Sequence, residues 1–254
     1  MDKQYKSLKQ TIDASGFPLQ IALENEVRRE DTIHQWKVLA HEHPWSNPAT
    51  QEKGFIDIIL GHNEKRIIIE CKLRKEDNWI FLVPNNAKFS QTTGRFYLTQ
   101  ISEAGYPQTK CIDENLSYPL LESEFCITRK GAGENLEDIA SKLILSIECL
   151  LDEELKIHQK LNDKDSFLYF PAIVTASKLF ICSFDPKKIS LDDGTMDEHS
   201  ADIKSVPYIK FTKSLTTNLT QDANPRKIMD TNKNRKRTVF IINSNHISDF
   251  LNKI

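Results

Sequence analysis

The sequence predicts an α/β fold in which a mixed central sheet is flanked by helices. Short apolar runs rich in Ile, Val and Phe recur along the chain and are typical of buried strands. Two segments, residues 19–29 and 136–158, instead repeat their apolar residues with a helical period. The chain has 254 residues, of which 39% are hydrophobic, and this favours one domain covering residues 1–254.

The N-terminal elements are expected in the order helix, strand, strand, strand. Residues 3–14 are polar and suit a short helix or an arm, and Pro18 suits the first turn of a helix that ends near Arg29. A strand is expected from Thr32 to about His43, followed by a loop. The stretch from Gly54 to Lys72 then reads as two apolar strands joined by a polar turn.

The rest of the chain is expected to divide into an insertion, residues 84–133, and a C-terminal elaboration, residues 134–254. After a strand at Trp79–Val83, the insertion is expected to be irregular because turn signals interrupt it repeatedly. The later elements are a helix from Leu136 to about His158, a hairpin of Ser166–Ala176 and Lys178–Phe184, strands at Pro207–Phe211 and Thr238–Ile242, and a closing helix at Ser244–Ile254.

Three charged residues interrupt the apolar strands between Gly54 and Lys72: Asp57, Glu70 and Lys72. A charge within a buried strand is costly unless it is paired or bound to a metal. If a four-residue loop, His62–Lys65, joins the strands, Asp57 lies opposite Glu70, and Lys72 shares their face of the sheet. A one-residue slip of this register would separate them.

Two carboxylates and an ammonium group on one patch suit a divalent cation, because Mg²⁺ prefers oxygen ligands and keeps several waters. A neighbouring lysine can orient a metal-bound water or stabilise charge on a phosphate. The alternative is a surface hairpin with a cross-strand Glu–Lys pair. The Ile-rich flanks favour the buried, functional interpretation.

Asp57, followed after twelve residues by Glu70-Cys71-Lys72, resembles the motif of the PD-(D/E)xK nuclease superfamily. The resemblance covers about residues 15–85 and implies a restriction-endonuclease-like αβββαβ core. It also implies that Asp57 and Glu70 bind Mg²⁺, for which Mn²⁺ can substitute, and that Lys72 assists the attacking water. The chain departs from the motif at Ile56, where the superfamily often has proline.

The superfamily often places a metal-site glutamate on its first helix. Glu24 best fits the usual Glu-x-x-Val pattern, and Glu26 is the second choice. The alternative is that both are solvated helix charges.

Two further groups of residues could bind ligands. His41 and His43 are expected on one strand face, where they could hold zinc, but solvent-facing histidines are favoured because no third ligand is near. A basic loop is expected near residues 212–237, where six side chains could neutralise phosphates: Arg226, Lys227, Lys233, Arg235, Lys236 and Arg237. The alternative is a solvated flexible segment.

The function expected from the resemblance is Mg²⁺-dependent hydrolysis of phosphodiester bonds by a DNA endonuclease, and by analogy a role in antiviral or foreign-DNA defence. One alternative is a catalytically silent module that binds nucleic acid or protein. Another is an RNase or a structure-specific resolvase. A homodimer is expected because a double-strand cut needs two sites and because the helix from Leu136 offers a broad apolar surface. The sequence does not identify a recognition sequence, a trigger or an operonic partner.

Composition limits the other classes. The net charge of −2 gives no global basic signature, so binding to a polyanion must rely on local patches. The five cysteines are scattered without a CxxC pair, which favours reduced thiols in a cytoplasmic protein. No run approaches the ~20 apolar residues of a membrane span, so no membrane contact is expected.

Overall fold

The computed structural model describes residues 3–29, 33–73, 78–86, 92–102, 105–128, 135–161, 165–196, 200–217 and 228–254. Its helices are α1 (Lys3–Ala14), α2 (Phe17–Val27), α3 (Leu136–Leu161), α4 (Ile228–Arg235), α5 (Ile247–Leu251) and the 3₁₀ turns η1 (Pro186–Lys188) and η2 (Ser244–His246). Its strands are β1 (Lys37–Ser46), β2 (Lys53–His62), β3 (Lys65–Lys72), β4 (Asn78–Pro84), β5 (Thr93–Ile101), β6 (Pro107–Asn115), β7 (Glu122–Ser123), β8 (Phe125–Ile127), β9 (Phe167–Thr175), β10 (Lys178–Phe184), β11 (Ala201–Val206), β12 (Tyr208–Ser214) and β13 (Lys236–Asn243).

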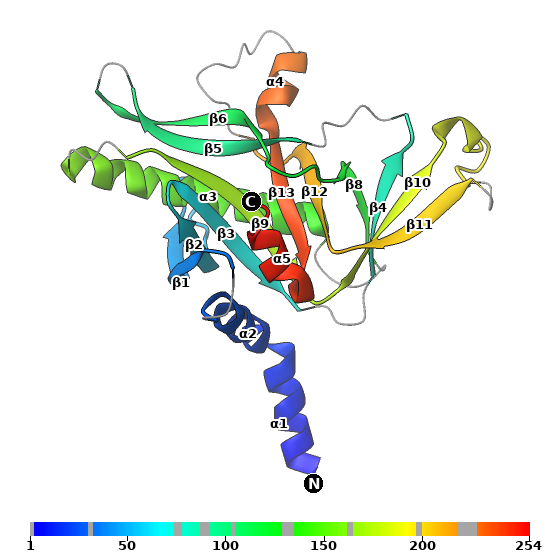
Figure 1. Cartoon of the computed structure of the whole chain (residues 1–254), viewed down its shortest axis with the longest axis horizontal. Helices are drawn as coiled ribbons and strands as arrows, with labels where there is room; N and C mark the ends of the chain where they lie inside the picture. The colour runs from blue at the N-terminus through cyan, green and yellow to red at the C-terminus, as the bar shows by residue number, and fades with distance from the viewer. Residues whose placement is uncertain are drawn as a thin grey trace.

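The main sheet is mixed, and helices flank it, as the sequence predicts for the α/β class (Figure 1). Its strands follow the order β1-β2-β3-β9-β13-β12-β7, and β5 and β6 join it along β9. The first three strands are antiparallel, whereas β9 runs parallel to both β3 and β13. A parallel neighbour requires a crossover, and α3 provides it immediately before β9.

Strand β9 changes its partner halfway along one edge. Its first half pairs with β5, where Tyr97 lies opposite Tyr169, and its second half pairs with β13 from Ala172 onward. Pro171 stands between the two segments. Proline has no N–H group to donate, so it is tolerated in this central strand where the ladder on that edge is interrupted.

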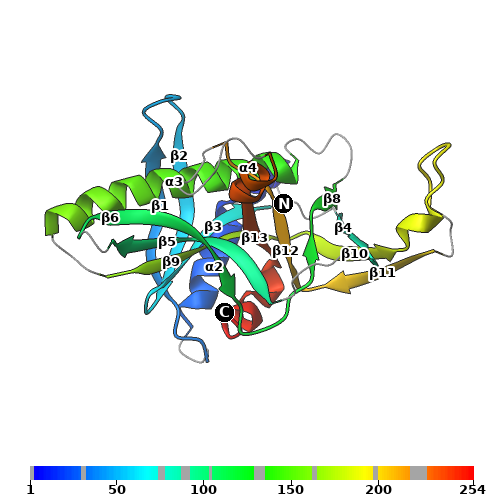
Figure 2. The ribbon, with the colours of Figure 1, turned by 90° about the horizontal axis from the view of Figure 1, so that it is seen from above.

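A second sheet, in the order β11-β10-β4-β8, extends to one side of the main sheet (Figure 2). The predicted hairpin of β9 and β10 is therefore wrong: β10 pairs in parallel with β4 and antiparallel with β11. The two residues between β9 and β10 carry the chain from one sheet to the other. There Asn243 donates a side-chain hydrogen bond of 2.8 Å to the carbonyl of buried Ser177, which fixes the crossing.

The insertion is also more regular than predicted. Strands β5 and β6 form a long antiparallel hairpin, with Thr93 opposite Asn115 at one end and Ile101 opposite Pro107 at the other. The turn signals in this part of the sequence mark the ends of strands. Gly105, for example, adopts a φ of 82° immediately before β6, a conformation that glycine adopts without strain.

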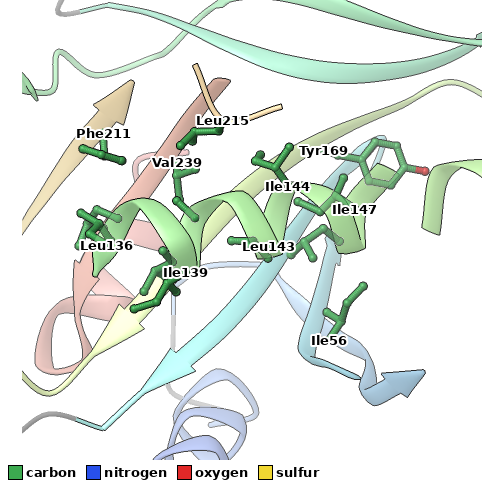
Figure 3. Close-up of a cluster of buried hydrophobic side chains, with 14 of the residues drawn as sticks. Ile56, Leu136, Ile139, Leu143, Ile144, Ile147, Tyr169, Phe211, Leu215 and Val239 are labelled. Atoms are coloured by element: carbon green, nitrogen blue, oxygen red, sulfur yellow. The ribbon is translucent and has the colours of Figure 1, made fainter. Parts of the chain in front are cut away.

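Helix α3 packs its apolar face across the main sheet (Figure 3). The same buried cluster also includes Trp79, Phe81 and Leu179 from the second sheet. Ile144 and Leu151, which widen the apolar surface of the helix, are 0% and 2% exposed. Because these side chains are already buried within a single chain, the helix surface no longer supports the predicted dimer contact.

The opposite face of the main sheet packs against α2 and α5. Its cluster joins Leu23 of α2, Phe250 of α5 and the strand residues Ile58, Ile67 and Ile69. Strands β2 and β3 are therefore covered on both faces, since Ile59 and Ile68 belong to the cluster beneath α3. This double burial places the charged residues of β2 and β3 in a largely apolar setting.

Candidate active site

The register of β2 and β3 is the one that the hairpin pattern predicts. Leu60 lies opposite Ile67, and Gly61 lies opposite Arg66. The ladder continues one step further, to His62 and Lys65, so the turn is shorter than predicted. It is made by Asn63, with a φ of 49°, and Glu64. Asparagine is among the residues that tolerate this left-handed conformation best.

The three predicted site residues lie close together where β2 and β3 separate. The last backbone pair is Ile58 with Ile69. Beyond it, a carboxylate oxygen of Asp57 accepts a 2.6 Å hydrogen bond from the backbone N–H of Cys71. Lys72 Nζ lies 2.8 Å from Glu70 Oε1, and the two side chains are 25% and 22% exposed. This open end, where the two strands separate, is the mouth of the hairpin. Here the Asp57 side chain accepts a hydrogen bond from a backbone N–H that no longer pairs with the backbone of β2.

Burial raises the pKa of Asp57 to about 7, and the negative charge of Glu70 adds to the effect. Glu42 raises this pKa further, whereas the Cys71 N–H and Lys72 lower it. Asp57 therefore carries its proton for part of the time at neutral pH. A cation bound beside it would favour the charged carboxylate, because an opposite charge stabilises the ionised form.

Helix α2 supplies Glu24, which is 8% exposed. Its Oε2 lies 3.1 Å from Arg28 Nη2 and 3.3 Å from His41 Nδ1, so the carboxylate is held by two basic groups. Its negative charge contributes to the raised pKa of Cys71, as do those of Asp57 and Glu70. Of the two predicted alternatives, Glu24 and Glu26, Glu24 is therefore the one that lies near the candidate site.

Glu26 faces elsewhere. Its Oε1 accepts a 2.8 Å hydrogen bond from Ser248 Oγ of α5, and its Oε2 lies 3.0 Å from Arg29. The α2 residue that contacts Asp57 directly is Gln20, whose Nε2 donates to the Asp57 carbonyl at 3.0 Å. Sequence reasoning missed Gln20, although its spacing of four from Glu24 places both on one helix face.

Glu42 is a second residue that sequence reasoning missed. Strand β1 pairs His41 with Ile58 and His43 with Ile56, so Glu42 lies level with Asp57 on the neighbouring strand. Its φ of 47° is unusual for a residue with a side chain, and such conformations cluster at functional sites. The sequence shows only a glutamate between two histidines. The pairing of β1 with β2 is needed to show that Asp57 is the neighbour of Glu42.

The left-handed backbone at Glu42 separates the two histidines. His41 contacts Glu24 of α2, whereas His43 Nε2 lies 3.8 Å from Glu153 of α3, on the other side of the sheet. The expectation that both imidazoles share one strand face is therefore wrong, because the side-chain alternation of a regular strand breaks at Glu42. The pair cannot bind one zinc ion between them.

The donor set at the hairpin mouth fits Mg²⁺ better than a soft metal. Asp57 and Glu70 offer carboxylate oxygens, and Glu42 lies beside them. No group of three His, Cys, Asp or Glu side chains close enough to hold a metal occurs among the residues that the structure describes. Two carboxylates nevertheless suffice for Mg²⁺, which retains waters as its remaining ligands.

The predicted basic loop is wrong where the structure describes it, because Lys233 and Arg235 lie on α4 and Lys236 begins β13. Arg226 and Lys227 lie outside the described residues. Lys233 is largely exposed and lies 3.8 Å from Asp113, while Lys236 is paired with Glu124. The side chain of Arg235 is half-buried.

Arg237 is a correction to the predicted phosphate contacts. It begins the buried part of β13 and is 1% exposed. Its Nη1 donates to the carbonyls of Asn234 and Lys236 at 2.6 and 2.8 Å, and its guanidinium lies 4.7 Å from the centre of the Tyr97 ring. It therefore stabilises the sheet and is not accessible to a nucleic acid at the surface.

A wide hollow of about 1130 Å³ lies between the tip of the β1–β2 hairpin and α3. Its lining combines the aromatic rings of Trp45 and Phe55 with more acids than bases, namely Glu148, Asp152 and Glu153 against Lys53 and Lys156. The acidic excess repels phosphate groups, so this hollow does not suit the path of a nucleic acid.

No protein-family model, characterised protein or solved structure matches this chain. In the described part of the chain, none of the helices is both long enough and apolar enough to cross a bilayer.

Proposed function

We propose that this protein is a Mg²⁺-dependent nuclease whose active site lies at the mouth of the β2–β3 hairpin. The observation that carries the proposal is the arrangement of Asp57, Glu70 and Lys72. A half-buried aspartate with a raised pKa lies beside a second carboxylate, which is itself paired with a lysine. A carboxylate with a perturbed pKa beside a second charged group is typical of catalytic and metal-binding sites.

The order of the elements supports the proposal. Helix α2, strands β1 to β3, helix α3 and strand β9 follow one another in the αβββαβ order implied by the PD-(D/E)xK resemblance, with β4 to β8 inserted before α3. Strand β9 is parallel to β3, and α2 and α3 contribute to the clusters on opposite faces of the sheet. The agreement in the order of the elements supports the proposal independently of the short motif.

Each residue then has a separate role. Asp57 and Glu70 would hold Mg²⁺, which neutralises charge on the phosphate and acidifies a bound water. The N–H of Cys71 fixes the orientation of the Asp57 carboxylate, and Gln20 ties its backbone to α2. Lys72, held 2.8 Å from Glu70, is placed to donate a hydrogen bond to the attacking water or to a phosphate oxygen.

Glu24 acts as a positioning residue in this proposal. Its carboxylate holds Arg28 and His41 at the boundary of the site instead of pointing unpaired at a metal. We therefore expect that Glu24→Gln reduces the rate less than substitution of Asp57 or Glu70.

The substrate that we propose is DNA, with foreign-DNA defence as the biological role that the resemblance implies. A double-strand cut needs two sites facing the duplex, and a twofold homodimer would provide them. Light scattering on the full chain should then give about twice the 29.3 kDa mass of one copy. A monomer that only nicks plasmid would instead indicate a single-strand enzyme.

The decisive experiment incubates the purified protein with supercoiled plasmid, linear duplex, single-stranded DNA and RNA, each with Mg²⁺, Mn²⁺ or EDTA. We expect metal-dependent cleavage of DNA that falls by at least ~10³-fold in Asp57→Asn, Glu70→Gln and Lys72→Met, as for loss of an essential catalytic group. Glu26→Gln is the matched control, because Glu26 contacts Ser248 and Arg29 and not the site.

Cleavage of RNA alone would redirect the proposal to an RNase. Binding of nucleic acid without cleavage in any metal would contradict it and favour a catalytically silent binding module. Full activity in any one of the three variants would remove that residue from the site.

A further inference from the structure

Two adjoining hollows lie at the other end of the β2–β3 hairpin, beside its turn. One, of about 460 Å³, is lined by His34, Trp36 and the C-terminal Asn252, among others. The other, of about 530 Å³, is lined by residues that include Lys37 and Arg66. Three residues line both: Gln35, His62 and Asn63. His62 is five residues from Asp57 on β2, so these hollows lie roughly 16 Å from the proposed active site.

The buried side chain of His34 is evidence for a ligand in the first hollow. It is 9% exposed, and within the described part of the chain both of its ring nitrogens are buried and have no hydrogen-bond partner outside His34 itself. Burial lowers the pKa of His34, although the charge of Glu26 and a hydrogen bond with the residue's own backbone oppose the effect, and this favours the neutral ring. A neutral imidazole presents one donor and one acceptor, and buried polar atoms are rarely left unpaired.

The wall of this hollow is aromatic. Trp36 is fixed by a 3.0 Å hydrogen bond from its Nε1 to the carbonyl of Leu251. Its ring lies 5.6 Å from that of His62 at an angle of 50°, so it supports the imidazole from one side. A planar heteroaromatic group can stack on such a ring, as nucleobases stack on aromatic side chains and histidine.

The second hollow is positively charged. The residues that line it include Lys37 and Arg66 and no acidic side chain among those described. Arg66 is held in place, since Nη1 donates to the carbonyls of Asn63 and Lys65 at 2.7 and 2.9 Å and the guanidinium lies 4.1 Å from the Phe167 ring centre. Lys37 is exposed at the start of β1, opposite Gly61. A fixed guanidinium beside an exposed ammonium group suits a phosphate.

We propose that the two hollows form one nucleotide-binding site, in which the base occupies the hollow of His34 and His62 and the phosphate lies between Lys37 and Arg66. The site takes a heteroaromatic base with hydrogen-bonding groups on its edge, joined to a phosphate. The source is either a free nucleotide or one unit of a single-stranded nucleic acid. The site stands apart from Asp57, so it does not depend on the proposed nuclease activity.

The test is calorimetric titration of the full chain with AMP, GMP, CMP and UMP, with the corresponding nucleosides, with inorganic phosphate, and with a short single-stranded oligonucleotide. We expect at least one mononucleotide or the oligonucleotide to bind more tightly than inorganic phosphate. A mononucleotide that binds alone identifies a free nucleotide as the source, whereas binding of the oligonucleotide only identifies a unit of a single strand.

Two variants separate the halves of the site. Lys37→Gln should weaken nucleotide binding about tenfold, as expected for loss of a charge-assisted contact, without affecting binding of the nucleoside. His34→Phe keeps the buried ring but removes both nitrogens, so it should weaken nucleotide and nucleoside alike. Lys187→Gln, which changes an exposed lysine of η1, is the matched control for charge.

Several results would overturn the proposal. One is that none of the nucleotides or the oligonucleotide binds. Another is that inorganic phosphate binds as tightly as the nucleotides, which would indicate an anion site without a base pocket. A third is that Lys37→Gln and Lys187→Gln weaken nucleotide binding equally, which would show that binding depends only on the net charge of the protein. Because Lys37 is on the surface, its variant keeps the test valid even if His34→Phe does not fold.

Discussion

The two ends of the β2–β3 hairpin carry opposite charge, although one ladder of buried isoleucines connects them. At the mouth, Asp57 and Glu70 lie beside Glu42, and Lys72 is their cationic neighbour. At the turn, cationic side chains predominate, and Arg66 is held by backbone carbonyl oxygens. The mouth is partly buried, which raises the pKa of Asp57 and favours a cation, whereas the turn is open and favours an anion.

The apolar middle of the hairpin determines the chemistry at both ends. Ile58 pairs with Ile69, and both are fully buried beneath α2 and α5. A slip of one residue would move every side chain to the other face of the sheet. The same register therefore brings Asp57 to Glu70 at one end and His62 to Lys65 at the other.

The largest effect on stability is expected from substitution of a buried isoleucine in the β2–β3 ladder, which connects both ends of the hairpin. Ile69→Ala removes a fully buried side chain, so it should lower the free energy of unfolding by about 3 kcal/mol. Urea unfolding of Ile69→Ala measures the loss, and Ile203→Ala on β11, where the side chain is 60% exposed, is the control and should change it by less than ~0.5 kcal/mol. Equal effects at the two positions would show that the hairpin is not the buried centre of the fold.

A smaller effect, of opposite sign, is expected at the mouth. Because the folded protein raises the pKa of Asp57 from 3.8 to about 7, ionisation of this group costs stability as the pH rises through that interval. Asp57→Asn removes the charge and keeps an oxygen for the Cys71 N–H. A shift of about three units corresponds to at most ~4 kcal/mol, and partial exposure reduces it, so the variant should be about 2 kcal/mol more stable at pH 8.

Below about pH 3 this advantage should vanish, because Asp57 is then protonated in both the folded and the unfolded protein. Unfolding at pH 8 and at about pH 3 without divalent cations checks both the sign and the window. A variant that is less stable than the wild type at pH 8 would contradict the raised pKa of Asp57.

The smallest effect is expected from Glu42. Glu42→Gly keeps the left-handed backbone and removes its steric cost, so it should raise the free energy of unfolding by about 1 kcal/mol. Glu42→Gln, in contrast, keeps the strain and should leave this quantity nearly unchanged. If both variants lower the rate of cleavage, the carboxylate of Glu42 contributes to the site. If neither does, Glu42 shapes only the backbone.

The sequence was sufficient for those parts of the fold that a repeated apolar pattern specifies. The Ile-rich strands and their polar turn predict the register of β2 and β3, and the long stripe of α3 predicts a helix that the structure places at Leu136–Leu161. Both elements bury residues at a regular spacing, so the period alone locates them.

Contacts between distant segments were not predictable in this way. Strands β9 and β10 are adjacent in sequence, yet they belong to different sheets because β10 pairs with the distant strands β4 and β11. Arg237 looks like part of an exposed basic run, but its ring contact with Tyr97 comes from the inserted hairpin. At the candidate site, Glu42 and Gln20 escaped prediction because their proximity to Asp57 depends on strand pairing and helix docking.

The most direct test of the central claim is a calorimetric titration of the protein with Mn²⁺ at pH 6.5 in two buffers of different ionisation enthalpy. Asp57 retains its proton for much of the time at this pH, because its pKa is about 7. Binding of the cation should therefore release a substantial fraction of a proton per ion, seen as a dependence of the heat on the buffer. This dependence should be lost in Asp57→Asn and kept in Glu26→Gln. Heats of binding that are independent of the buffer, or equal binding by wild type and Asp57→Asn, would contradict a cation site at the mouth of the hairpin.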